Sequence, residues 1–365
     1  MKIVFIVQGE GRGHLTQAVS LFQQLEGSSH HVVACFIGRI EKDAFTSEVE
    51  KGILTPIHYF NSPNLIYNQK SQGLSLRSTL IHNIKHLPKH AKSLCDLKKS
   101  MDFYRPDLII NFYDFLAGIY QLRFPFSAPP MVCIGHQYLL LHPQFEFPKK
   151  KYIDRLLVNL NSKVTAIRAK KLWALSFSQF QVTKRMICLP PLIRKTALEE
   201  PKGLQPYFVA YLTNSNLLEQ LANWHIKNMD IELHCFTKNS QGQEVTQLHK
   251  NLFIHKLDNK KFLKLMANAK GLVTTAGFES VCEAIYFGKP VMMVPVKNHF
   301  EQACNALDAE RYGAGIAQES FDLDMFMSYV KSFQSKSQKF TKWLAEGKSL
   351  MLHELDGLEK TLKST

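Results

Sequence analysis

The side chains with the clearest potential for chemistry lie in the segment 271–302, GLVTTAGFESVCEAIYFGKPVMMVPVKNHFEQ. A short apolar run there ends in small and hydroxyl residues, among them Thr275 and Gly277, and a helical pattern follows. Such a junction presents unpaired backbone N–H groups and the positive end of the helix dipole, which commonly hold phosphate. Ser280 would add a hydroxyl, and Glu283 could accept hydrogen bonds from a ribose. The turn alone is equally compatible with an ordinary capped joint.

The elements that position this turn can be predicted from the same segment. The apolar run 272–275 predicts a strand, and apolar residues at helical spacing predict a helix that Gly288 and Pro290 end. Residues 291–296 form a continuous apolar run, which is typical of a strand buried on both faces. This order of strand, turn, helix and strand is typical of a parallel α/β sheet.

The run TAGFESVCEA, followed by FGKPVMMVPVKNHFEQ, NAL and AERYGAG, resembles the donor-site signature of GT-B glycosyltransferases. It is similar to UDP-glycosyltransferases and to the bacterial enzymes that add N-acetylglucosamine to lipid I. The resemblance implies that a Gly–aromatic–x–Ser turn holds the pyrophosphate, a Glu holds the ribose, and an acidic–Gln pair holds the sugar hydroxyls. The corresponding residues of this chain are Gly277, Phe278, Ser280, Glu283, Glu301 and Gln302.

The chain departs from the plant-type pattern at three positions. Thr275 stands where those enzymes carry His, Glu279 where they carry Asn, and Glu301 where they carry Asp. We count Thr275 and Glu301 among the nucleotide-sugar-binding residues. Glu279 would add a negative charge beside a diphosphate, so we assign it no ligand role.

A second glycine-rich turn lies at the start of the chain. Residues 2–8 predict a buried strand, the sequence GEGRGH occupies 9–14, and a helical pattern follows. The turn fails the dinucleotide fingerprint G-x-G-x-x-G, because His14 stands at its sixth position. The next strand ends near Arg39 rather than an acid, which argues against NAD and leaves an NADP interpretation open.

Polar residues follow several predicted strands of this first half. Asp114 and His136 each come after an apolar run, and His14 follows the first strand. Ligands of open α/β sheets bind at the carboxyl ends of the strands, so we expect these three side chains to face one cleft. His14 is the candidate catalytic base, because imidazole titrates near neutral pH, and Asp114 would orient it. The acceptor-side candidates are Gly11, Arg12, Gly13 and His136.

The resemblance also implies donor contacts early in the second half. These are Thr213, Asn214 and Ser215 at its first strand–helix turn, and Leu257 where the uracil ring would lie. We expect no metal or other cofactor, because no D-x-D motif follows a strand and a helix N-terminus can neutralise the leaving diphosphate. His82, His86 and His90 share one helical face, and we favour a solvated basic face over a metal site there.

Composition limits the class of protein. The 365 residues suffice for two domains, and 45% apolar with 21% charged residues is typical of a globular protein. Seven scattered cysteines, no secretory leader and no apolar run long enough to span a bilayer predict a cytoplasmic protein. The net charge of +14 is compatible with an anionic substrate or the inner face of a membrane. We expect no nucleic-acid partner, because no known nucleic-acid-binding motif is present.

The alternating strands and helices predict an α/β protein with two Rossmann-like lobes around a central cleft. We expect an acceptor-binding domain at 1–192, a nucleotide-sugar-binding domain at 193–340, and a helix at 341–365 that packs back on the first domain. The proline-broken segment 139–151 mixes apolar and basic residues, so it either touches a membrane or packs as a connection.

The predicted function is that of an inverting glycosyltransferase. It would move a hexose or N-acetylhexosamine from a UDP-sugar to a hydroxyl acceptor, and a lipid-linked acceptor is compatible with the basic charge. Two alternatives stay open at this point. One is a UDP-sugar 2-epimerase of the same fold, and the other is a non-catalytic protein that binds a nucleotide sugar or a lipid.

Overall fold

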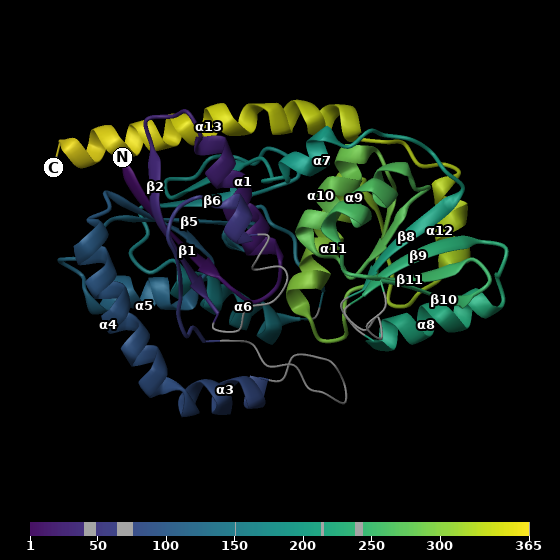
Figure 1. Cartoon of the computed structure of the whole chain (residues 1–365), viewed down its shortest axis with the longest axis horizontal. Helices are drawn as coiled ribbons and strands as arrows, with labels where there is room; N and C mark the ends of the chain where they lie inside the picture. Colours follow the sequence, from purple (N-terminus) through teal and green to yellow (C-terminus); the bar gives the residue numbers. More distant parts are fainter. Residues whose placement is uncertain (40–48, 64–75, 150, 213–214, 238–243, 365) are drawn as a thin grey trace.

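The computed structural model describes residues 1–39, 49–63, 76–149, 151–212, 215–237 and 244–364. These residues form two lobes, which lie at the left and right of Figure 1, and each lobe is built on one sheet. Helices cover both faces of each sheet, and a long helix at the C-terminal end runs back over the first lobe.

The sheet of the first lobe has the strand order β3-β2-β1-β4-β5-β6-β7, and its neighbours are parallel. Its strands are β1 Lys2–Gln8, β2 His31–Gly38, β3 Ile57–Tyr59, β4 Leu108–Phe112, β5 Met131–Gly135, β6 Lys171–Leu175 and β7 Met186–Leu189. The order places β1 and β4 side by side at the centre, so their carboxyl ends meet at one edge. The turns after these two strands carry His14 and Asp114.

The sheet of the second lobe has the order β10-β11-β9-β8-β12-β13-β14, and only the β10–β11 pair among the described strands is antiparallel. Its strands are β8 Tyr207–Leu212, β9 Glu232–Thr237, β10 Val245–His249, β11 Leu252–Lys256, β12 Leu272–Thr274, β13 Val291–Met293 and β14 Gly315–Ala317. The central strand β12 leads directly into the predicted donor turn.

The first-lobe helices are α1 Gly13–Leu25, α3 Leu76–Lys85, α4 Leu87–Tyr104, α5 Phe115–Arg123, the 3-10 turn η1 His136–Leu141, and α6 Tyr152–Thr165. The remaining helices are α7 Lys195–Glu199, α8 Ser215–Ile226, α9 Asn259–Asn268, α10 Phe278–Phe287, α11 Phe300–Tyr312, α12 Leu323–Val330 and α13 Ser337–Lys363. The sheets separate the chain between β7 and β8, where the sequence predicts the linker. The division at residues 192 and 340 stays a prediction.

Side chains of β1 show how both faces of the sheet are buried. Ile3, Phe5 and Val7 pack into the apolar core beneath α1 and α13, whereas Val4 and Ile6 pack into the core beneath α4 and α5. Successive side chains of a strand point to opposite faces of the sheet, and both faces are buried here. The strand sequence is therefore a continuous apolar run.

The C-terminal helix α13 lies across the top of the first lobe in Figure 1. Trp343 of this helix donates a hydrogen bond from Nε1 to the Ser176 carbonyl at 2.9 Å, and Phe340 and Leu355 are fully buried. Near its C-terminal end, the Asp356 carboxylate lies 2.9 Å from Nε2 of the buried His30. These contacts attach the last helix of the chain to the first lobe.

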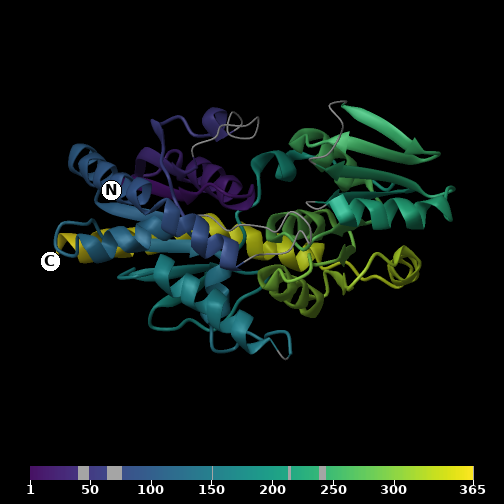
Figure 2. The same ribbon diagram turned by 90° about the horizontal axis from the view of Figure 1, so that it is seen from below.

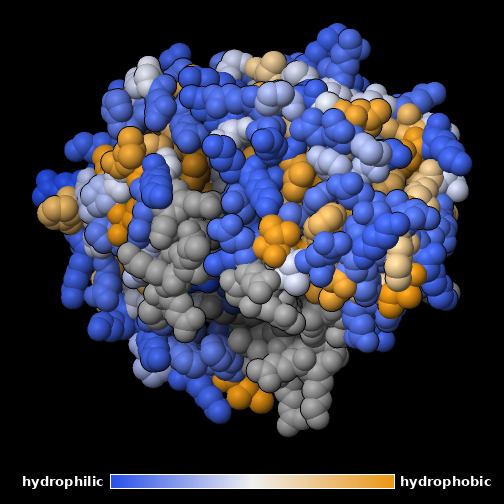
Figure 3. Space-filling view, turned by 45° about the vertical axis from the view of Figure 1, so that its right-hand side comes forward, coloured by the Kyte–Doolittle hydropathy of each residue, from blue (hydrophilic) through white to orange (hydrophobic). Residues whose placement is uncertain are grey.

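For the segment before α6, the sequence leaves two alternatives open, contact with a membrane and packing as a connection. Leu139, Leu140 and Phe145 are buried in the core beneath α4 and α5, so residues 139–145 pack as a connection, whereas Lys149 and Lys151 at the end of the segment are exposed. No helix in the described ranges combines the length and hydropathy needed to cross a bilayer. The face of the molecule shown in Figure 3 is mostly hydrophilic, with apolar residues in small patches.

The three helix-spaced histidines do not form a metal-ligand cluster. His82 and His86 stack with ring centroids 4.2 Å apart, but the His86 and His90 rings are 6.5 Å apart and His90 is buried. Across the described residues, the group that places three possible ligand atoms close together is His30, Asp356 and Glu359. That group holds α13 against the first lobe and lies outside the predicted site.

Candidate active site

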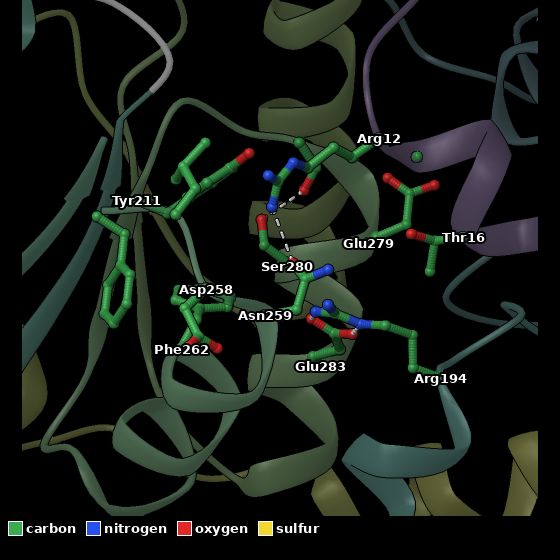
Figure 4. Close-up of a pocket in the computed structure, with 14 residues that line it drawn as sticks. Arg12, Thr16, Arg194, Tyr211, Asp258, Asn259, Phe262, Glu279, Ser280 and Glu283 are labelled. Carbon is green, nitrogen blue, oxygen red and sulfur yellow. Dashed lines mark hydrogen bonds and ion pairs between the residues drawn. The ribbon is translucent and has the colours of Figure 1, made fainter. Parts of the chain in front are cut away.

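The turn between β12 and α10 has the geometry that the sequence predicts. Ala276 adopts a positive φ of 62°, Gly277 is the N-cap of α10, and Gly288 ends the helix in the left-handed conformation. A cavity of about 180 Å³ opens at this turn and receives residues from both lobes (Figure 4). The N-terminus of α10 therefore points into a partly open space between the lobes, where an anion would meet the helix dipole.

This interlobe cavity brings several predicted residues together. Of the donor-side predictions it is lined by Gly277, Ser280, Glu283 and Leu257, and of the acceptor-side predictions by Arg12 and Gly13. Thr275, Phe278, Glu301, Gln302, His14, Asp114 and His136 do not line it. Thr213 and Asn214 lie outside the described residues, and Ser215 is described only as the first residue of α8.

Hydrogen bonds within the donor turn leave its hydroxyls partly engaged. The Ser280 hydroxyl donates to the Gly277 carbonyl at 3.0 Å and lies 3.4 Å from the Thr274 hydroxyl. Thr275 is buried, with 2% of its surface exposed. The Ser280 hydroxyl thus bonds within the turn rather than capping α10, whose N-cap Gly277 has no side-chain cap, and the cavity lies at the first turn of this helix.

Glu283 forms the strongest ion pair of the cavity. Nε and Nη2 of Arg194 donate to its two carboxylate oxygens, each at 2.6 Å, and Glu283 is 1% exposed. Figure 4 shows both side chains on the wall of the cavity. A buried carboxylate needs such a countercharge, because an unpaired charge would lose its hydration. The pairing fixes the carboxylate that the sequence assigns to ribose binding.

Arg12 links the lobes on the opposite side of the cavity. Its guanidinium donates to the Asn259 side-chain oxygen at 2.9 Å, which joins the turn before α1 to the first turn of α9. Apolar wall residues of the same cavity include Leu257, Phe236 and Phe262. The cavity therefore combines two arginines, three carboxylate side chains (Asp258, Glu279 and Glu283) and an apolar wall, a mixture of charged and apolar groups that small-molecule sites share.

His14 lies between two glutamines, and each glutamine contacts a glutamate of the second lobe. Nε2 of Gln137 lies 3.3 Å from Nε2 of His14 and donates to Glu301 at 2.9 Å. Nε2 of Gln17 donates to Glu279 at 2.6 Å, while the Gln17 oxygen and Nδ1 of His14 are both buried and lack a hydrogen-bond partner among the described residues. The predicted base is thus connected to the second lobe through Gln137 and Glu301.

Burial controls the protonation of this network. It lowers the pKa of His14 to about 4, against a smaller raising effect of Gln17, so the ring is neutral at physiological pH. Burial raises the pKa of Glu279 to about 7, partly opposed by hydrogen bonds, and it also raises the pKa of Glu301. Neutral His14 can accept a proton, but a pKa of about 4 makes it a weaker base than the near-neutral imidazole that the sequence predicts.

Asp114 does not orient His14 in the way that the sequence predicts. One of its carboxylate oxygens accepts a hydrogen bond from the Leu116 N–H and caps α5, and the other lies beside Gly38 and Ser62. Burial raises the pKa of Asp114 to about 7. No hydrogen bond joins Asp114 to His14 among the residues that the structure describes, because the carboxylate is committed to the N-terminus of its own helix.

His136 and Phe278 form the packing between the lobes. Their rings stack with centroids 3.9 Å apart, and Phe177 lies 4.9 Å from Phe278. Nδ1 of His136 bonds the Leu175 carbonyl at 2.8 Å, and burial lowers its pKa to about 4. His136 is 2% exposed, so it is not open to an acceptor as predicted.

The predicted sugar-binding pair is also engaged with protein groups. Glu301 accepts from Gln137, while the side-chain oxygen of Gln302 accepts from the Val296 N–H at 2.8 Å. Gln302 therefore holds the loop before α11 in this structure. Its role in binding a sugar stays a prediction.

Sequence reasoning missed several residues of this site, among them Gln17, Gln137, Arg194 and Glu279. Glu279 was set aside because its charge would oppose a diphosphate, yet it lines the cavity and contacts the first lobe. Arg194 follows the break Pro190–Pro191, and its position as a cation between the two predicted domains is the one sequence feature that could have indicated a role in the site. The two glutamines carried no signal, since nothing in their spacing shows that they contact the second lobe.

Solved structures that resemble this one include glycosyltransferases. MurG of Acinetobacter baumannii covers 99% of this chain and 100% of its own length, with a TM-score of 0.57 and 14% identity. UGT2 of Phytolacca americana, complexed with UDP-2fluoro-glucose and pterostilbene, covers 98% of both chains, with a TM-score of 0.63 and 12% identity. The calicheamicin glycosyltransferase CalG4 covers 98% of both, with a TM-score of 0.61 and 14% identity. No curated protein sequence shows significant similarity to the chain.

The two lobes, the turn at α10 and these likenesses define a glycosyltransferase of the GT-B fold, which confirms the predicted fold class and the predicted resemblance. The sequence profile of glycosyl transferase family 1 matches residues 1–336. The chain belongs to that family.

Proposed function

We propose that this enzyme transfers a hexose or N-acetylhexosamine from a UDP-sugar to a hydroxyl acceptor with inversion at the anomeric carbon. The observation that carries the proposal is the cavity of about 180 Å³ at the N-terminus of α10, lined by both lobes. A donor there would contact the helix dipole, and an acceptor would approach from the first lobe.

The cavity offers partners for the three parts of the nucleotide. The diphosphate would lie at the first turn of α10, close to the cations Arg12 and Arg194. Glu283, held by Arg194, would accept hydrogen bonds from the ribose hydroxyls, and the uracil ring would lie against Leu257. No metal or other cofactor is part of this proposal, because helix dipole and arginines can stabilise the leaving diphosphate.

The choice of uracil is the finer part of the proposal. Among the structural neighbours, UGT2 of Phytolacca americana and LpCGTa are complexed with UDP compounds. VinC is complexed with DTDP and the spinosyn rhamnosyltransferase SpnG with thymidine diphosphate. The donor signature favours UDP, and a thymidine diphosphate sugar is the competing donor.

His14 would serve as the base through Nε2. Nδ1 of His14 and the Gln17 side-chain oxygen are both buried without a hydrogen-bond partner among the described residues, so a bond formed between them would place the proton on Nδ1 and the lone pair on Nε2, which lies 3.3 Å from Nε2 of Gln137. The acceptor hydroxyl would replace Gln137 there and give its proton to Nε2 as its oxygen attacks the anomeric carbon. The bond from that carbon to the diphosphate oxygen breaks, and the electron pair leaves with UDP.

Gln17 and Glu279 would then orient the base in place of Asp114. Glu279 fixes the Gln17 amide, and the amide oxygen would accept from Nδ1 of the ring, in the manner of the third group of a catalytic triad. Because Glu279 belongs to the second lobe, this arrangement depends on contact between the lobes.

Membership of a glycosyltransferase family does not favour the 2-epimerase alternative. Mass spectrometry of products from a matrix of UDP-sugars, thymidine diphosphate sugars and hydroxyl acceptors tests the proposal. A new glycoside and free UDP, with inverted configuration by nuclear magnetic resonance, are expected. An epimerised free sugar formed without acceptor would indicate the alternative activity, and transfer only from the thymidine diphosphate sugar would correct the donor.

A further inference from the structure

Helix α6, Tyr152–Thr165, carries a stripe of exposed apolar side chains. Tyr152, Ile153, Leu156 and Leu160 are 78%, 74%, 67% and 55% exposed. At about 100° of rotation per residue, these four positions fall within one sector of the helix. The helix packs its other side, including the buried Ser162 and Thr165, against α5 and the turn η1. The structure therefore leaves the apolar side of α6 facing outward.

Cationic side chains surround this stripe. Lys149 and Lys151 precede the helix, and the exposed Arg155 and Lys163 lie along it. Arg155 lies 4.0 Å above the Phe147 ring, which holds its guanidinium at the start of the helix. Asp154 is the single acidic residue of α6 and lies 3.9 Å from Lys151. The stripe and its margin thus present apolar groups within a positively charged border.

This combination favours a bilayer with anionic headgroups over a second copy of the chain. Two copies that met through α6 would bring the same cations together, and like charges in an interface are unfavourable. An anionic lipid surface instead attracts each cation and accepts the apolar side chains between its headgroups. Tyr152 suits the boundary, since its ring is apolar and its hydroxyl can stay in water.

We propose that α6 is the surface through which the enzyme docks on an anionic phospholipid membrane. The four apolar side chains would enter the headgroup region, with the lysines and Arg155 at the lipid phosphates. Helix α6 also contacts α11 of the second lobe, so the docked surface adjoins the boundary between the lobes (Figure 2). A membrane-borne hydroxyl acceptor would then lie near the cleft, and this last step alone rests on the proposed function.

Vesicle cosedimentation of the full chain tests the docking. The wild type should bind vesicles of phosphatidylcholine with phosphatidylglycerol more tightly than phosphatidylcholine alone, and added salt should weaken the binding. The double variant Ile153→Ser/Leu156→Ser should lose about tenfold or more in affinity, because two buried aliphatic side chains are worth at least that factor. The charge variant Lys149→Glu/Lys151→Glu should lose the preference for anionic vesicles.

Leu204→Ser is the matched control, because Leu204 is 74% exposed in the connection between the lobes and away from α6. It should bind vesicles like the wild type, and all variants should keep the wild-type circular dichroism spectrum and UDP affinity. Absence of binding to anionic vesicles at low salt, or equal binding by the Ile153→Ser/Leu156→Ser variant, would overturn the proposal. A dimer that this variant dissociates, with no vesicle binding, would show that α6 binds a second copy. Because UDP affinity is measured separately, failure of docking leaves the proposed function standing.

Discussion

Two strand–turn–helix units face each other across the lobes, and they differ in what the first two turns of their helices carry. The unit β1–α1 brings neutral polar groups, His14 and Gln17, whereas the unit β12–α10 brings two glutamates, Glu279 and Glu283. The carboxylate of each glutamate accepts hydrogen bonds from a residue that precedes the second-lobe sheet in the chain. Gln17 donates to Glu279, and Arg194 donates to Glu283. The comparison shows that the acidic donor turn depends on partners that are distant in the sequence.

The neutral unit should matter for the chemical step and the acidic unit for binding and stability. His14→Ala removes the proposed base, so we expect the rate of glycosyl transfer to fall by about 10²–10⁴. UDP affinity should change little, because His14 does not line the interlobe cavity. Single-turnover kinetics and UDP calorimetry measure the two effects. Near-full turnover by the folded variant would show that His14 is not the base and that the β1–α1 unit takes no part in the chemical step.

The pair of Arg194 with Glu283 should dominate the stability of the acidic unit. Arg194→Met leaves a buried carboxylate without its countercharge, and we expect a loss of about 3 kcal/mol in the free energy of unfolding. Urea unfolding measures it, and Arg194→Met/Glu283→Gln should recover most of the loss. The matched control Lys195→Met removes an exposed cation and should cost less than about 1 kcal/mol. Equal losses for the two single variants would contradict this account.

The carboxyl of Glu279 should make stability depend on pH. Its pKa in the folded state, about 7, lies above the ordinary value of 4.5, so the folded state holds the proton more tightly. Stability is therefore lost as pH rises from about 4.5 to 7. Since the side chain is partly accessible, we expect about 2 kcal/mol.

Glu279→Gln should remove that dependence while it keeps the contact with Gln17. In urea unfolding, the free energy of unfolding of the variant should rise relative to the wild type by about 2 kcal/mol between pH 4.5 and 7. Above pH 7 this difference should stay constant. Asp114 and Asp308, whose pKa values are also raised to about 7, contribute equally to both proteins and cancel in the difference. A difference that does not vary with pH would mean that Glu279 is charged throughout.

The smallest effect should come from Asp114, although the sequence places it beside the base. Asp114→Asn keeps an oxygen that can accept from the Leu116 N–H, so the cap of α5 should survive. We expect turnover within a few-fold of the wild type and a stability change below about 1 kcal/mol. A rate loss comparable with that of His14→Ala would restore Asp114 as the orienting group.

The sequence was sufficient for the fold because both lobes depend on local patterns. The continuous apolar strands and the glycine at the end of α10 predict parallel sheets and the turn between β12 and α10. The site was only partly predictable, since the partners of Glu279 and Glu283 lie 262 and 89 residues away. No periodicity connects such residues, and the role of Gln17 becomes visible only when α1 and α10 are placed together.

Calorimetric titration of UDP into the wild type and Glu283→Ala tests most directly whether the turn at α10 is the donor site. The account predicts that the variant folds and binds UDP more weakly by about 1.5–3 kcal/mol, the range for charge-assisted hydrogen bonds. Equal UDP affinity in the two folded proteins would contradict it, because the nucleotide would then lie away from Glu283.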